Sequence, residues 1–188
     1  RVVAPDQIGF CTSTKPQQYQ YTFQQLADNT HQLLEKLGVE RAIVMGHSTG
    51  GMLATRYALM FPQQTEKLVM VNPIGLEDWK AKGVPWRSVD EWYERELKTT
   101  AAGIKAYEQK TYYMGRWKPE YDKWVDMLAG MNTGPGKEIV AWNSALIYDM
   151  IATQPVVYEF PQLKVPTTLF IGTGDTTAPG SDTAPEAV

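Results

Sequence analysis

The sequence predicts an α/β fold: a mostly parallel sheet with helices on both faces and an inserted helical region. Short apolar runs alternate with helical patterns in residues 1–73, and one further run follows at 166–172. These runs are continuously apolar, which is typical of parallel strands covered on both faces. Residues 74–160 contain no comparable strand run and hold all six tryptophans. Alternating strands and helices therefore favour a parallel sheet interrupted by a helical insertion.

The first elements follow from local signals. Residues 1–5 (Arg-Val-Val-Ala-Pro) form a β-branched run that ends in proline, which predicts a strand. Residues 6–21 are polar and predict a loop. Thr22 opens a helix, and Gln25 is expected to complete a capping box. Apolar residues then recur at spacings of three and four until Gly38, which has the position of a C-terminal cap.

A strand, a tight turn and a second helix come next. Residues 42–45 (Ala-Ile-Val-Met) are expected to form a strand buried on both faces. A helical pattern over 52–61 ends at Pro62. Residues 67–71 and 166–172 predict two further buried strands.

The middle of the chain predicts helices rich in aromatic residues. The pattern indicates helices over about 88–99, 102–114, 119–130 and 136–151, with Pro135 breaking the last two apart. Most of the aromatic side chains are expected to pack against one another or against the sheet. The predicted organisation is a core part at 1–73, a helical cap at 74–160, and a core strand with an acidic turn at 161–188.

Composition restricts the class of function. The 188 residues carry a net charge of −3, so no basic footprint supports nucleic-acid binding. Cys11 is the single cysteine, which excludes an internal disulfide and a cysteine-based metal site. No run of 18 apolar residues occurs, so no membrane span is predicted. No metal or cofactor is implied, and oligomeric state and compartment stay open.

The strongest chemical signal is Gly46-x-Ser48-x-Gly50 between a buried strand and a helix. A turn this sharp is expected to strain the central residue and to expose its hydroxyl. Glycines flank it because side chains there are expected to clash. The N–H of Thr49, at the start of the helix, would then point to where a carbonyl oxygen becomes negative.

Three motifs together resemble the α/β-hydrolase superfamily. Residues 46–51 (Gly-His-Ser-Thr-Gly-Gly) resemble its nucleophile elbow, and residues 4–10 (Ala-Pro-Asp-Gln-Ile-Gly-Phe) resemble the segment after its fourth strand. Residues 171–175 (Ile-Gly-Thr-Gly-Asp), together with Pro179, resemble its acidic turn. The resemblance covers nearly the whole chain and is closest to serine esterases with a helical cap. Haloalkane dehalogenases and epoxide hydrolases carry Asp at the elbow, so Ser48 argues against both.

The resemblance implies a role for each site residue. Ser48 would attack the carbonyl of a small apolar carboxylic ester, the N–H of Thr49 would bind the oxyanion, and an acyl-enzyme would form. Asp175 would orient a catalytic histidine, a role for which Asp182 is less well placed. The cap would shape an apolar pocket for the substrate; Met52 and Met150 are within reach of it but are not assigned to it.

The catalytic histidine is absent from the expected position. In the resembled family it follows the acidic residue, yet no histidine lies between Asp175 and Val188. His47 and His31 are both expected to be structural. The family's third strand, with its His-Gly loop that donates a second oxyanion N–H, would precede Arg1. We therefore expect these residues to be an internal fragment of a longer protein and to be inactive alone.

Three alternatives stay open. The same triad hydrolyses carbon–carbon bonds, lactones, amides and thioesters in the resembled superfamily. A triad-defective relative would instead bind a ligand under its cap without turnover, which the missing histidine favours. An interaction fragment with an exposed sheet edge would aggregate.

Overall fold

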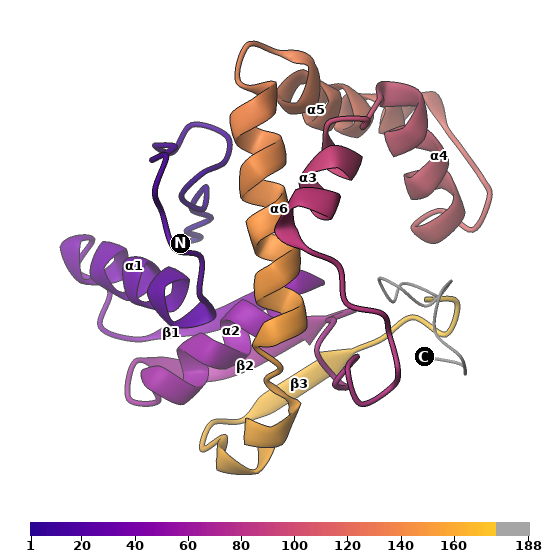
Figure 1. Cartoon of the computed structure of the whole chain (residues 1–188). Helices are drawn as coiled ribbons and strands as arrows, with labels where there is room; N and C mark the ends of the chain where they lie inside the picture. Colours follow the sequence, from indigo (N-terminus) through magenta and orange to yellow (C-terminus); the bar gives the residue numbers. More distant parts are fainter. Residues whose placement is uncertain (176–188) are drawn as a thin grey trace. The chain divides into compact units, whose positions relative to one another are not determined.

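The computed structural model describes residues 1–175, which divide into two compact units. The core unit contains residues 20–86 and 150–173, and the helical unit contains residues 1–19, 87–149 and 174–175. Figure 1 shows the order of the elements along the chain. Each unit is described below by its own contacts.

The core unit is built on a parallel three-stranded sheet. The strands are β1 (Ala42–His47), β2 (Thr65–Val71) and β3 (Thr167–Phe170), and they lie in the order β1-β2-β3 (Figure 1). Met45 on β1 pairs with Val69, and Val71 on β2 pairs with Phe170. All three correspond to predicted strands, and because they are parallel their carboxyl ends share one edge of the sheet.

The strand predicted at residues 1–5 is wrong. These residues adopt no regular structure and are mostly exposed. A strand needs a partner for its backbone groups, and this segment belongs to the helical unit rather than to the sheet. The chain then bends sharply, because the carboxylate of Asp6 accepts hydrogen bonds from the N–H and the hydroxyl of Thr12 at 3.1 and 2.5 Å.

Helix α1 (Phe23–Lys36) begins and ends as predicted, with one difference at its cap. The Thr22 hydroxyl accepts a hydrogen bond from the N–H of Gln25, and Gly38 has a φ of +66° just after the helix. The Gln25 side chain donates to Asn29 at 3.2 Å instead of returning to the cap, so half of the predicted capping box forms.

Helix α2 (Thr49–Met60) covers one face of the sheet. Ala54 and Ala58 on this helix pack against Leu68 and Met70 of β2, and all four are buried. Full burial of a side chain such as Leu68 contributes about 2 kcal/mol to folding. Because Val44 of β1 packs on the same cluster, β1, α2 and β2 share one core.

The opposite face of β1 is not covered in the described residues, which contradicts the expected burial on both faces. Ile43 is 56% exposed and Met45 is 66% exposed, whereas Val44 between them packs on the buried cluster. Phe170 on β3 is also exposed, at 55%. The alternation of side chains along a strand explains the pattern, because α2 shields one face only.

The helical unit contains the four predicted helices close to their expected bounds. They are α3 (Val89–Glu96), α4 (Ala101–Thr111), α5 (Asp122–Thr133) and α6 (Lys137–Thr153), the last continuing into the core unit at Met150. A short helix η1 (Pro119–Tyr121) precedes α5, and η2 (Val157–Gln162) lies in the core unit.

Aromatic side chains supply much of the packing in the helical unit. Trp92 stacks on Tyr148 with ring centroids 4.3 Å apart, and Tyr113 stacks on Tyr121 at 4.0 Å. The unit also holds its N-terminal loop, because the buried amide of Asn143 donates to the backbone oxygen of Gly9 at 2.9 Å. The stacked rings are half-buried, and Tyr107 and Trp124 are exposed, so the expectation that most aromatic residues of this region build its core stays a prediction.

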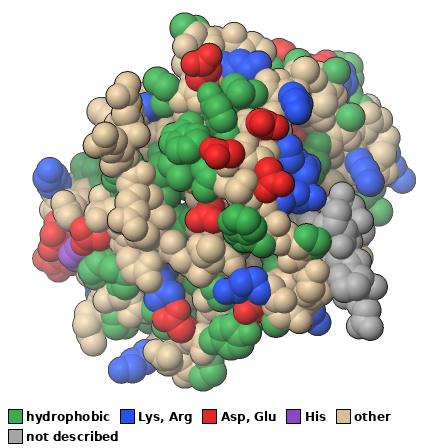
Figure 2. Space-filling view, in the orientation of Figure 1, with side chains coloured by type: hydrophobic (Ala, Val, Ile, Leu, Met, Phe, Trp, Pro, Cys, Tyr) green, Lys and Arg blue, Asp and Glu red, His purple; other side chains and the backbone are tan. Residues whose placement is uncertain are grey.

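Side chains of both charges share the surface (Figure 2). Figure 2 shows acidic and basic side chains interspersed on the face that it presents, without a large field of one sign. Among the helices of residues 1–175, none is long and apolar enough to cross a membrane.

Candidate active site

The turn between β1 and α2 holds Ser48 in a strained backbone conformation. Its φ is +53° and its ψ is −123°. Positive φ is uncommon for a residue with a Cβ, and such strain costs about 1–3 kcal/mol. A serine before a helix ordinarily has extended backbone and caps the helix with its hydroxyl, but Ser48 makes no such bond. The strained turn is therefore confirmed, and the Ser48 hydroxyl is not committed to α2.

Backbone hydrogen bonds anchor this turn to the segment after β2. The N–H of Ser48 donates to the oxygen of Val71 at 3.2 Å, and the oxygen of Ser48 accepts from the N–H groups of Ile74 at 3.2 Å and Gly51 at 2.8 Å. Both backbone groups of Ser48 are thus satisfied by neighbouring chain. Strain at a single residue persists only where its surroundings fix it in this way.

The glycines around Ser48 have unequal roles. A Cβ on Gly46 would lie 1.9 Å from the backbone oxygen of Gly50, so no side chain fits there. A Cβ on Gly51 would lie 2.4 Å from the Cβ of Pro73. Around Gly50 nothing lies within 4 Å of an added Cβ, so the expected clash at this position is wrong. The turn requires Gly46, and the packing of α2 on the following loop requires Gly51.

Thr49 is the first residue of α2. The first N–H groups of a helix have no intrahelical acceptor, and the helix dipole places partial positive charge at this end. An oxygen that becomes negative beside Ser48 would meet this environment. The role of Thr49 as the oxyanion donor stays a prediction.

Asp175 lies five residues after the end of β3 and is exposed. It is the last described residue, and it belongs to the helical unit whereas Ser48 belongs to the core unit. Its role as the acid of a triad therefore stays a prediction. Pro179 and Asp182 lie outside the described residues.

His31 is engaged in structural contacts, as expected. Its Nδ1 lies 2.7 Å from Gln64 Oε1, its Nε2 lies 3.6 Å from Glu35, and its ring stacks on Phe61 at 4.0 Å. Gln64 immediately precedes β2, so this cluster sits at the amino end of the strands, whereas Ser48 follows the carboxyl end of β1. His47 is exposed and is the last residue of β1; its structural role stays a prediction.

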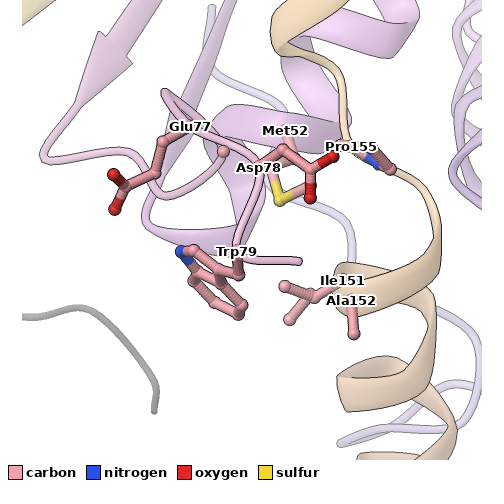
Figure 3. Close-up of a pocket in the computed structure, with 8 residues that line it drawn as sticks. Met52, Glu77, Asp78, Trp79, Ile151, Ala152 and Pro155 are labelled. Carbon is pink, nitrogen blue, oxygen red and sulfur yellow. The ribbon is translucent and has the colours of Figure 1, made fainter. Parts of the chain in front are cut away.

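A small pocket lies beside the start of α2 (Figure 3). It is a shallow hollow of about 220 Å³, a figure that includes space open to solvent, and its enclosed part has room for about one water molecule. Met52 lines it, whereas Met150 is buried and does not. All of its lining belongs to the core unit, including Glu77, Asp78, Trp79, Ile151 and Pro155.

Hydrogen bonds fix the acidic segment of this pocket. The carboxylate of Asp78 accepts from the hydroxyl of Tyr158 at 3.0 Å and from the N–H of Lys80 at 2.9 Å. The bond to Asp78 raises the pKa of Tyr158, because it favours the protonated phenol. Glu77 lies 4.0 Å from Lys82. Within residues 1–175, no group of three or more His, Cys, Asp or Glu side chains is arranged to hold a metal ion.

A family model described as the alpha/beta hydrolase fold matches residues 1–186. The chain belongs to this family. This α/β hydrolase is 68% identical to a probable hydrolytic enzyme of known structure from Pseudomonas aeruginosa, with a TM-score of 0.93. That match covers 96% of this chain and 58% of the other.

Two curated relatives are more distant. The 2-hydroxy-6-oxo-2,4-heptadienoate hydrolase of Pseudomonas putida is 30% identical over 148 residues, which is 69% of this chain and 54% of the relative. The cis-3-alkyl-4-alkyloxetan-2-one decarboxylase of Xanthomonas campestris is 30% identical over 118 residues, which is 55% of this chain and 39% of the relative. This α/β hydrolase chain thus covers less than two thirds of each relative's length.

Two features of the site were missed in the sequence. One is the close contact of Gly51 with Pro73, and the other is that of Gly75 with Met52. The signal for both was present, since Asn-Pro-Ile-Gly at 72–75 directly follows a predicted strand. A proline–glycine segment marks a turn, but only the folded chain shows which helix it touches.

Proposed function

We propose that this α/β hydrolase is a serine hydrolase that acts on a small apolar carboxylic ester through an acyl-enzyme. The observation that carries the proposal is the strained Ser48, whose hydroxyl is not used to cap α2. Strain held at one residue by its surroundings is typical of functional sites. The family match supports hydrolysis in general.

The proposed chemistry uses few groups of this chain. The Ser48 oxygen attacks the ester carbonyl, the alcohol leaves, and water then releases the acid from the acyl-enzyme. The N–H of Thr49 stabilises the oxyanion, a contribution of about 3 kcal/mol for one such donor. Asp175 orients the histidine that accepts the serine proton. We propose that this histidine is neither His31, which is held by Gln64 and Phe61, nor His47, which precedes the strained turn at the end of β1.

A second candidate is hydrolysis of a carbon–carbon bond or a lactone with the same residues. It is favoured by the two curated relatives, one named as a hydrolase of a heptadienoate and the other as a decarboxylase of an oxetan-2-one. The first of these substrates carries a carboxylate, whereas a simple apolar ester carries none. A non-catalytic binding role is the third candidate, and it would require that Ser48 never be acylated.

Chemical rescue tests the proposal on the chain as it exists. Release of p-nitrophenol from p-nitrophenyl butyrate would be followed with and without added imidazole, which supplies a proton acceptor. The measured quantity is the rate of the natural chain minus that of Ser48→Ala, since imidazole alone also cleaves the ester. Ser13→Ala, in the N-terminal loop, is the matched control.

We expect no Ser48-dependent release without imidazole and a rise of about tenfold or more with it, because a positioned base contributes 10²–10⁴-fold to such reactions. Ser13→Ala should behave as the natural chain. Absence of any Ser48-dependent release, together with no labelling of Ser48 by a fluorophosphonate, would refute the hydrolase proposal. Ser48-dependent release without imidazole would refute only the exclusion of His31 and His47 as the base.

A further inference from the structure

A buried carboxyl group lies near the end of α4 in the helical unit. Glu108 is 5% exposed, and within residues 1–175 its Oε2 atom makes no hydrogen bond. Burial raises the pKa of Glu108, because the ionised carboxylate is poorly solvated there. A charged oxygen without a partner is costly away from water. The surroundings of Glu108 therefore suit the protonated acid and not the carboxylate.

Lys105 lies one turn before Glu108 on α4, and residues three apart on a helix are neighbours. The Lys105 ammonium is nevertheless bonded to Asp122 Oδ1 at 2.8 Å, and it lies 4.9 Å from the ring centre of Trp117. The indole N–H of Trp117 donates to the same Asp122 oxygen at 2.9 Å. Asp122 is the first residue of α5, which packs on α4 (Figure 1). Lys105 thus ties α4 to the start of α5.

The two carboxyl groups within reach of Lys105 differ in burial. The side chains of Lys105 and Asp122 are 43% and 48% exposed, and an ion pair this exposed is weak because water solvates both charges. The bonds from Lys105 and Trp117 hold the pKa of Asp122 below its ordinary value, so Asp122 stays ionised near neutral pH. An ionised Glu108 would be buried without a partner, which is far less favourable. Once Glu108 loses its proton, Lys105 is therefore favoured beside Glu108.

The other titratable groups around Glu108 are phenols or belong to another cluster. Burial raises the pKa of Tyr112 and Tyr113, which interact with the charge of Glu108, so both stay protonated near neutral pH. Arg95 acts on Tyr148 and not on Glu108. By element, these groups are Tyr112 and Tyr113 after α4, Tyr121 on η1, Tyr148 on α6, and Arg95 and Glu96 on α3. Among the described residues, Lys105 is the cation that Glu108 can recruit.

We propose that Glu108 and Asp122 compete for Lys105, and that loss of the Glu108 proton moves the ammonium from Asp122 to Glu108. The arrangement described above is the protonated state. The proton passes to solvent, and only hydrogen bonds change. The exchange breaks the bond between α4 and the first residue of α5 and withdraws the cation from Trp117. The helical unit thus contains a pH-sensitive contact, an inference that goes beyond the proposed function and does not depend on Ser48.

An NMR titration of the full chain follows both ends of this exchange. The side-chain carboxyl ¹³C signal of Glu108, identified through Glu108→Gln, gives the midpoint of its ionisation. The indole N–H signal of Trp117, identified through Trp117→Phe, reports the departure of Lys105. The titration would run from about pH 4 to about pH 9. Glu120→Gln removes an exposed carboxylate two residues before Asp122 and is the matched control.

We expect both signals to move with one common midpoint above 4.5, the ordinary value for a glutamic acid. Glu108→Gln should hold the Trp117 signal constant over this range, and Glu120→Gln should leave both midpoints unchanged. Lys105→Gln should raise the Glu108 midpoint, because the carboxylate then has no cation to recruit.

Two results overturn the proposal. One is a Trp117 signal that stays still through the Glu108 midpoint, and the other is a Glu108 midpoint that Lys105→Gln does not raise. If Glu108→Gln does not fold, sequential assignment identifies the Glu108 signal in the natural chain, where the common midpoint is still measured.

Discussion

Arg56 on α2 donates two hydrogen bonds to the carboxylate of Glu159 on η2, with Nη1 2.8 Å from Oε2. Arg56 is 8% exposed, and its Nε makes no hydrogen bond within the described residues. Two parallel bonds between a guanidinium and a carboxylate fix orientation as well as distance. The pair therefore holds η2 against the helix that directly follows Ser48.

Loss of this ion pair should destabilise the core unit. We expect Glu159→Gln to lower the free energy of unfolding by about 1–3 kcal/mol, because Arg56 is then left buried without its charged partner. Urea denaturation measures the change. Glu40→Gln, at an exposed site before β1, removes the same charge and should change stability by less than about 0.5 kcal/mol. Equal effects of the two variants would show that the pair contributes nothing specific.

The same pair predicts a pH dependence with a definite sign. The hydrogen bonds from Arg56 hold the pKa of Glu159 below its ordinary value. A carboxyl group with a lowered folded pKa stabilises the fold above its unfolded pKa, and that stabilisation is lost as the pH falls through the folded pKa. The natural chain should thus exceed Glu159→Gln in stability above about pH 5, and the gap should close in more acidic solution. A gap that stays constant down to pH 3 would contradict this.

Backbone strain at Ser48 predicts that glycine at this position gives a more stable fold than alanine. Glycine adopts positive φ freely, so Ser48→Gly should be more stable than Ser48→Ala by about 1 kcal/mol. Thermal and urea unfolding of the two variants would measure this difference. Both lack the hydroxyl, so any difference between them reports the backbone alone. Lower stability of Ser48→Gly would mean that the turn relaxes when Ser48 is replaced.

Gly46 and Gly50 differ in the space around an added Cβ, so alanine at the two positions should have different effects. Gly46→Ala should disrupt the turn, since its Cβ would meet the oxygen of Gly50 at 1.9 Å. Gly50→Ala meets open space in α2 and should be neutral or stabilising by up to about 1 kcal/mol, because alanine favours the helix. Circular dichroism with thermal unfolding compares them. A similar loss in both variants would indicate that Gly50 is confined in a way that the present contacts do not show.

Elements that depend on residues close together in the chain were predictable from the sequence. The strands β1, β2 and β3, the end of α1 at Gly38 and the four helices of the helical unit all follow from periodicity, capping and turn residues. The predictions that were wrong depend on contacts between segments far apart in the sequence. Residues 1–5 have strand composition but no partner strand in the described chain, and Ile43 and Met45 have core composition but no covering helix there.

For the site, the sequence located the reactive turn but not its surroundings. The motif around Ser48 indicated a strained turn between a strand and a helix, because that conformation restricts which residues fit. Nothing local indicated that Asp78 would lie beside Met52, or that Tyr158 would fix it, since these contacts join segments far apart in the chain. The partner of Asp175 likewise depends on tertiary placement and stays a prediction.

Strand β1, which directly precedes Ser48, is the outermost member of the described sheet, with β2 on one side only. Its outer row of amide and carbonyl groups is therefore a template on which another extended backbone could assemble. A strand added there would brace the base of the reactive turn from the unsupported side. If two chains pair reversibly along this edge, the rate of reaction at Ser48 should rise with protein concentration. Rate measurements on this chain should therefore state the protein concentration.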